Sequence, residues 1–141
     1  MHAAERDPAA IRHARRNLPA PGRVHRADVL AGLPAKLRSR IDVLAAVPPY
    51  VPEGEAHLIP RDLRAHEPAA ALLAGPDGLA AARTLLAEAG GWLAPGGVLL
   101  LELHRDQAAA AAAIARAAGL TAGYRTGPDG QTATLRAAKP G

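Results

Sequence analysis

A near-continuous apolar run from Val98 to Leu103 constrains the fold of this chain more than any other feature. Every residue in it except Glu102 is Val or Leu. Strands of parallel sheets have such runs because helices cover both of their faces. Helical patterns lie on either side, over 79–93 and over the Ala-rich stretch 107–118, which we expect Asp106 to cap and Gly119 to end. The run therefore predicts a strand inside an α/β sheet.

The other predicted elements continue this alternation. Asp7 and Pro8 have the residue types of a helix N-cap and first helical position. Short or weak stretches predict strands at 2–5 and 23–26, and a more apolar one predicts a strand at 41–46. Two strands near 120–126 and 131–137 flank a turn at 128–130 and suggest an antiparallel hairpin. We expect one domain over residues 1–141, a doubly wound, mostly parallel sheet with helices on both faces and a C-terminal hairpin. The stretch 51–75 lacks a regular pattern, and 107–118 could also be a simple low-complexity helix.

Composition narrows the functional classes. The chain has no cysteine, which excludes disulfides and cysteine-based catalysis, and its six histidines lack metal-ligand spacing. No apolar run of about 18 residues occurs, so we expect a soluble cytoplasmic protein without membrane contact. The net charge is +4, but the basic residues are scattered along the chain, which argues against nucleic acid as the direct substrate.

The segment 41–50 has the character of a ligand site. Five of the six residues Ile41 to Ala46 are apolar and suggest a short buried strand, which runs directly into Pro48-Pro49-Tyr50. Ligands of open α/β sheets bind at the carboxyl ends of strands. The two prolines fix the backbone φ and remove two N–H donors, so the carbonyl groups of this loop stay available to accept from a ligand. We call residues 47–50 the elbow.

Two acidic residues also fall at predicted strand ends. Glu5 ends the first strand and Asp28 follows the second. Acids in these positions of a nucleotide-binding fold accept hydrogen bonds from ribose hydroxyls or an adenine amino group. The alternative is that both are solvated or capping carboxylates.

These residues, in this order, resemble those of the HemK-type protein-(glutamine-N5) methyltransferases. Members of that family are class I S-adenosylmethionine-dependent enzymes that methylate a glutamine amide of peptide chain release factors. The matching segments follow the family's order over nearly the whole chain: Glu5 to Ala10, Ala14 to Leu18, Asp28, Pro48 to Pro52, His66 to Pro68, Ala71-Leu72, Gly75, Asp77 to Leu79, Leu93 to Gly97, Leu101-Glu102 and Gln107.

The resemblance implies roles for the site residues. Glu5 matches the family's ribose-binding acid and Asp28 the acid near the adenine of S-adenosylmethionine. Pro48, Pro49 and Tyr50 match the end of the Asn-Pro-Pro-Tyr catalytic signature, in which the Asn side chain and the first proline's carbonyl accept the two amide hydrogens and the tyrosine ring packs on the amide. Val47 occupies the position of the asparagine and has no side-chain acceptor.

The resemblance also places the family's first strand, glycine-rich loop and N-terminal substrate-recognition domain before residue 1. We therefore expect that Met1 lies inside a longer reading frame, or else that the sheet closes without its central strand. Three functions remain open: a release-factor methyltransferase, inactive or weakened by truncation and by Val47; a non-catalytic domain of this fold that binds protein; and a methyltransferase for exocyclic base amines.

Overall fold

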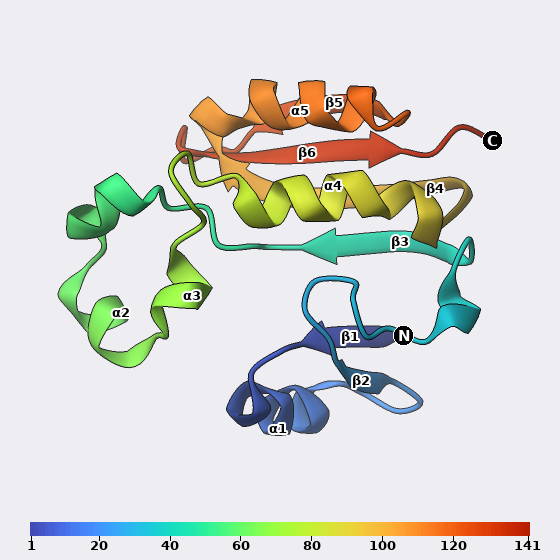
Figure 1. Ribbon diagram of the computed structural model, residues 1–141, viewed down its shortest axis with the longest axis horizontal. Coiled ribbons are helices and arrows are strands. Elements are labelled where there is room, and N and C mark those ends of the chain that lie inside the picture. The colour runs from blue at the N-terminus through green and yellow to red at the C-terminus, as the bar shows by residue number, and fades with distance from the viewer. The chain divides into compact units, whose positions relative to one another are not determined.

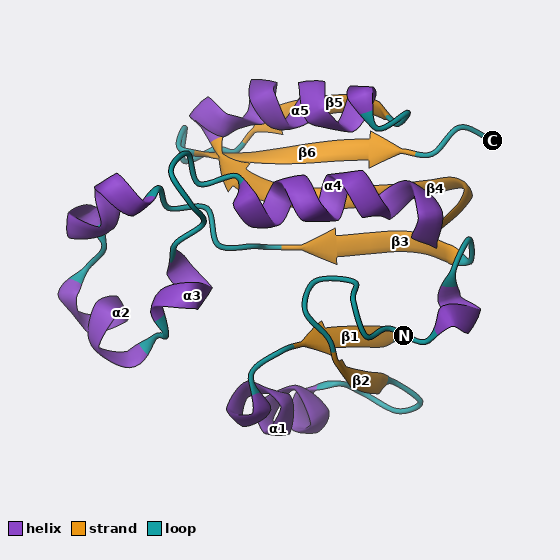
Figure 2. Cartoon of the chain, viewed as in Figure 1, coloured by secondary structure: helices purple, strands orange, loops and turns teal.

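The computed structural model describes all 141 residues, which form two compact units, Met1–Arg38 and Ser39–Gly141. Their helices and strands are shown in Figure 1 and coloured by type in Figure 2. The first unit contains β1 (His2–Glu5), α1 (Pro8–Asn17) and β2 (Arg23–Arg26), in which the two strands pair in parallel. Asp7 is the N-cap of α1 and accepts from the backbone N–H of Ala9 at 2.7 Å, which confirms the predicted helix start.

The second unit is built on a four-stranded mixed sheet in the order β3-β4-β6-β5. Its strands are β3 (Ile41–Ala46), β4 (Leu93–His104), β5 (Thr121–Thr126) and β6 (Thr132–Ala138). β3 is parallel to β4, whereas β4 and β6, and β5 and β6, are antiparallel. The α/β class, the parallel pair and the C-terminal hairpin are thus confirmed.

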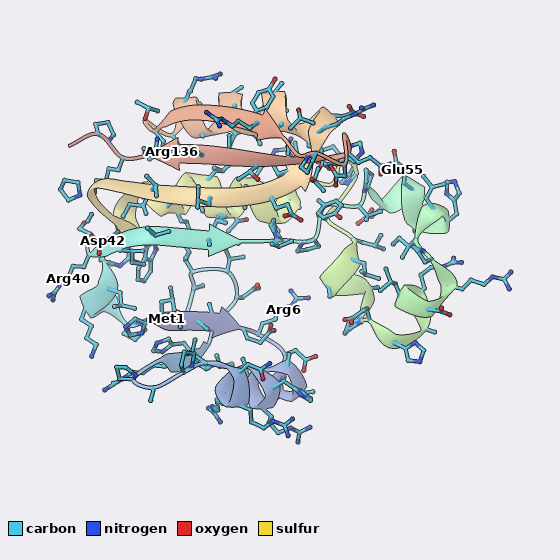
Figure 3. The ribbon with its side chains drawn as sticks, turned by 180° about the vertical axis from the view of Figure 1, so that it is seen from behind. Met1, Arg6, Arg40, Asp42, Glu55 and Arg136 are labelled. Atoms are coloured by element: carbon cyan, nitrogen blue, oxygen red, sulfur yellow. The ribbon has the colours of Figure 1, made fainter.

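Two long helices cover one face of this sheet, α4 (Ala80–Trp92) and α5 (Ala108–Ala117), as Figure 1 shows. The core lies between them and the strands, where alternate residues of β4 are almost fully buried, among them Leu99, Leu101 and Leu103. The opposite face carries no helix within this unit, and Figure 3 shows Arg136 of β6 on it. Ile41–Ala46 forms the predicted strand, but the prediction that it is buried was wrong: none of its residues is fully buried, because β3 is an edge strand.

The long connection between β3 and α4 is partly helical. It contains the 3-10 segment η2 (Glu53–Leu58) and the short helices α2 (Arg61–His66) and α3 (Ala69–Leu72), which project away from the sheet. A second 3-10 turn, η1 (Ala35–Leu37), ends the first unit, and a third, η3 (Arg105–Gln107), joins β4 to α5. The prediction that Asp106 caps the Ala-rich helix was wrong, because α5 has Gln107 as its N-cap and Asp106 lies inside the η3 turn, which His104 caps. No helix combines the length and apolar character that crossing a membrane requires.

Candidate functional site

The elbow lies where the sequence places it, directly after the carboxyl end of β3. Since β3 and β4 are parallel, with Ala46 in register with Leu101, the carboxyl end of β4 and the following η3 turn lie at the same edge of the sheet. This edge is where ligands bind in open α/β sheets. The structure thus brings the elbow and the residues after β4 together.

The exposed groups of the elbow are mainly those at its start. Val47 is 69% exposed, and Pro48, Pro49 and Tyr50 are half-buried. The carbonyl oxygens of Pro48 and Pro49 accept no hydrogen bond, whereas that of Tyr50 accepts one from the side chain of Gln107 at 2.8 Å. The elbow therefore offers two free acceptors and an aromatic ring, but the Val47 side chain adds no polar group.

Gln107 is the residue that sequence reasoning from chemistry missed. It entered only as one position of a family resemblance, yet it is the one buried polar side chain of the protein, 9% exposed. The available sequence signal was an amide placed between the apolar strand β4 and a helix of alanines, where a polar side chain is out of pattern.

The residues that follow the elbow are hydrogen-bonded to the segment 72–75, which precedes α4. The N–H of Val51 donates to Leu72 O at 3.2 Å, and Val51 O accepts from the N–H of Ala74 at 3.0 Å. The N–H of Glu53 donates to Gly75 O at 3.0 Å. These backbone contacts explain why the irregular stretch 51–75 stays attached at both of its ends.

The turn before α4, which contains Asp77 and Gly78, lies next to the elbow. Asp77 accepts two hydrogen bonds from the Arg83 guanidinium, at 2.9 and 2.6 Å, and one from the N–H of Leu79 at 3.1 Å. The hydrogen bonds from Arg83, followed by that from Leu79, lower the pKa of Asp77 to about 2. The carboxylate therefore stays ionised and fixes the turn from which the backbone of Asp77 and Gly78 faces the elbow.

Glu5 and Asp28 lie in the other unit, Met1–Arg38, at the carboxyl ends of the adjacent parallel strands β1 and β2. Glu5 Oε1 accepts from the N–H of Asp7 at 2.8 Å, so this carboxylate also has the capping contact that the alternative interpretation expects. Asp28 starts a tight turn, with reciprocal backbone hydrogen bonds to Ala31 at 3.0 and 2.9 Å. Its side chain is 67% exposed, and Arg6 Nη1 lies 3.8 Å from Oδ1. Both acids are thus held at one edge of the two-stranded sheet.

A surface hollow of the second unit lies away from the elbow. It has a volume of about 550 Å³ and is lined by β5 and β6, with Arg125, Arg136 and Tyr124 among its residues. β5 is the sheet edge opposite β3. The hollow contains none of the predicted site residues.

Comparison with known proteins identifies close relatives. The chain is 41% identical over 131 residues to a release factor glutamine methyltransferase of Moorella thermoacetica, a match that covers 92% of this chain and 46% of that protein. It is 44% identical over 126 residues to the protein of that name from Burkholderia pseudomallei, covering 83% and 43%. A 4-amino-L-phenylalanine/4-methylamino-L-phenylalanine methyltransferase of Streptomyces pristinaespiralis is 41% identical over 112 residues, covering 79% and 38%. The chain spans less than half the length of these relatives.

Solved structures show the same fold at low identity. A methyltransferase from Pyrococcus furiosus superposes with a TM-score of 0.66 at 19% identity, over 99% of this chain and 62% of that one. The antibiotic-resistance methyltransferase Kmr superposes with a TM-score of 0.59 at 16% identity, over 98% and 74%. No family model matches the chain.

Proposed function

Because this chain is homologous to the release factor glutamine methyltransferases over most of its length, we propose that it carries part of a site for S-adenosylmethionine-dependent methylation of a glutamine side-chain amide. The observation that supports this most directly is the elbow itself. It follows a parallel strand at the ligand-binding edge of the sheet and keeps the Pro48 carbonyl free. The proposed substrate is a release-factor loop that presents the glutamine.

The elbow acts by positioning. An amide nitrogen is a poor nucleophile because its lone pair is delocalised into the carbonyl group. A Pro48 carbonyl that accepts one amide hydrogen, with the Tyr50 ring against the amide plane, would orient the nitrogen for in-line attack. The amide nitrogen held there would take the methyl group from the sulfonium of a bound S-adenosylmethionine, leaving a neutral thioether, and would release one proton to solvent.

Glu5 and Asp28 fit the adenosine end of the methyl donor. Ribose hydroxyls and the adenine amino group are hydrogen-bond donors, and these two carboxylates are acceptors held at neighbouring strand ends. S-adenosylmethionine supplies the activated methyl group. The role of the two acids is to bind the adenosine end of this methyl donor.

Titration calorimetry with S-adenosylhomocysteine tests this half of the proposal. Wild-type protein should bind saturably, and Glu5→Ala or Asp28→Ala should weaken binding roughly 10–100-fold, the usual value of a hydrogen bond to a charged group. Glu5→Gln keeps an acceptor for the N–H of Asp7 and should have a smaller effect. Glu88→Ala, which removes an exposed carboxylate from α4, is the matched control. Equal affinity in all variants would contradict the assignment of the two acids.

Val47→Asn tests the catalytic half. Restoring the second amide acceptor should raise methyl transfer to a release-factor glutamine peptide by roughly 10²–10³-fold, the cost of losing one preorganised polar contact in a transition state. Val43→Asn makes the same change at an exposed position of β3 and should not raise it. No transfer by wild type or Val47→Asn, under conditions where S-adenosylhomocysteine binds, would favour the non-catalytic, protein-binding function.

A second candidate is methylation of an amine. Val47 favours it because an amine nitrogen, even an aromatic one, delocalises its lone pair less than an amide nitrogen does and depends less on two acceptors to react. The relative from Streptomyces pristinaespiralis is named for an aromatic amine substrate. If wild type methylates 4-amino-L-phenylalanine and Val47→Asn lowers that rate, the amine is the better assignment.

A further inference from the structure

We propose that Gln107 is a positioning residue for the substrate elbow: it fixes the backbone of Tyr50 and thereby sets where the Pro48 carbonyl and the Tyr50 ring meet the acceptor amide. The inference rests on the proposed function for its catalytic consequence. Its structural content, a clamp on the elbow by one buried amide, stands on contacts within residues 39–141.

The side chain of Gln107 joins three segments. Its Nε2 donates to Tyr50 O at 2.8 Å and to Asp77 O at 3.1 Å, and its Oε1 accepts from the N–H of His104 at 3.3 Å. These atoms belong to the elbow after β3, the turn before α4 and the end of β4. Both amide hydrogens are used, and the group is buried, where such bonds are electrostatically stronger than in water. One side chain thus ties the elbow to both of its neighbours.

The backbone of Gly78 packs closely against the Gln107 side chain and the Tyr50 carbonyl. Gly78 has φ +71°, and a Cβ at this position would collide with Tyr50 O and with Nε2 of Gln107. The glycine therefore serves two purposes, a left-handed turn and the close approach of three chain segments. The φ angle alone does not account for this glycine, because Gly130 has nearly the same φ and a Cβ added there would meet nothing within 4 Å.

Clamping Tyr50 determines the rest of the elbow because little freedom remains between its ends. At one end, Ala46 is paired with β4. At the other, Tyr50 O is held by Gln107, and Val51 is held by Leu72 and Ala74. Between them, Pro48 and Pro49 have φ fixed by their rings. A shift of the Tyr50 carbonyl therefore moves the free Pro48 carbonyl with it.

Gln107→Glu is the direct test. The carboxylate has nearly the same shape but no hydrogens to donate, and it would face two carbonyl oxygens. Gln131→Glu is the matched control, since Gln131 is the protein's other glutamine and is exposed. Protein labelled with 3-fluorotyrosine has two ¹⁹F signals, from Tyr50 and Tyr124, which Tyr→Phe variants assign. We expect Gln107→Glu to shift or broaden the Tyr50 signal and to leave that of Tyr124, on β5, unchanged.

Gly78→Ala provides a second route that keeps Gln107 intact. Gly130→Ala is its control, because Gly130 has nearly the same φ, +68°, but a Cβ added there would meet nothing within 4 Å. Both variants introduce left-handed strain, and only Gly78→Ala displaces the Tyr50 carbonyl. We expect a Tyr50 ¹⁹F change in Gly78→Ala alone.

The consequence for methyl transfer separates positioning from a general structural role. Gln107→Glu should lower kcat by about 10²-fold, as a displacement of about 1 Å at a reacting group does, with the KM for S-adenosylmethionine unchanged. An unchanged Tyr50 signal in both Gln107→Glu and Gly78→Ala would overturn the positioning role, whatever the activity. If instead the ¹⁹F changes occur and wild type transfers no methyl group to amide or amine, the clamp stands and the proposed function fails.

Discussion

At the scale of single residues, Asp77 links stability to pH. Its pKa is lowered to about 2, first by the hydrogen bonds from Arg83 and then by that from the N–H of Leu79. In the unfolded chain an aspartate titrates near 3.9. Because the folded pKa is the lower one, the stabilisation is fully present above about pH 4 and is lost as the pH falls toward 2.

Asp77→Asn should therefore reduce the loss of thermal stability between pH 4 and pH 2, as measured by circular dichroism melting. The asparagine keeps an acceptor for the N–H of Leu79, so the turn itself should persist. Since the ion pair is exposed, the effect should shrink at high salt. Asp62→Asn, which removes an exposed carboxyl on α2, is the matched control. An equal change in both variants would argue against the stabilising role of the hydrogen bonds from Arg83 to Asp77.

The residues of the site differ in how far sequence could predict them. The positions of the elbow and of the two acids at strand ends were predictable because prolines and carboxylates there form local patterns, and their binding and catalytic roles stay predictions. The capping contact of Glu5 with the N–H of Asp7 was an open alternative, and the structure shows it. The position of Gln107 gave a sequence signal, but its contacts were not predictable, because its partners Tyr50 and Asp77 are 57 and 30 residues away in the chain.

At the scale of elements, β4 shows what an apolar run does and does not determine. The run from Val98 to Leu103 predicted a strand covered on both faces. Within its unit only one face is covered: Leu99, Leu101 and Leu103 pack under the helices, whereas Leu100 and Glu102 on the other face are half-buried. A run of leucines carries no period, so the sequence could predict the strand but not which of its faces meets α4 and α5.

This asymmetry predicts unequal costs for equal substitutions. Leu101→Ala should lower the free energy of unfolding by about 2–5 kcal/mol, because Leu101 is fully buried and its removal leaves a cavity. Leu100→Ala, one residue away on the half-buried face, should cost about 1 kcal/mol. Urea denaturation followed by Trp92 fluorescence measures both. Equal losses would mean that the second face of β4 is as well covered as the first.

At the scale of the whole molecule, the two units differ in their cores. In Met1–Arg38, whose sheet has two strands, the buried apolar residues are Ile11, Ala27 and Leu30. In Ser39–Gly141 the core extends along four strands and two helices. Two-stranded sheets are marginally stable unless something packs on them.

Amide hydrogen exchange should reflect this difference. Peptides that cover β1 and β2 should exchange faster than peptides that cover β4 and β6, because local opening costs less where few apolar groups are buried. Mass spectrometry of exchanged peptides measures this directly. S-adenosylhomocysteine should slow exchange around Glu5 and Asp28 if these residues bind it. Equal protection of the two units without ligand would contradict the expected hierarchy.

The edge strand β3 has a consequence for the behaviour of the protein at high concentration. Within Ser39–Gly141 it pairs with β4 alone, so its other side has no strand partner in this unit, and Val43 and Val47 are 60% and 69% exposed. Such an edge can add a strand from another molecule. Asp42, labelled in Figure 3, is the one charged residue within the strand. Asp42→Asn should therefore accelerate thioflavin-positive aggregation, whereas Asp106→Asn, which removes a carboxylate outside β3, should not.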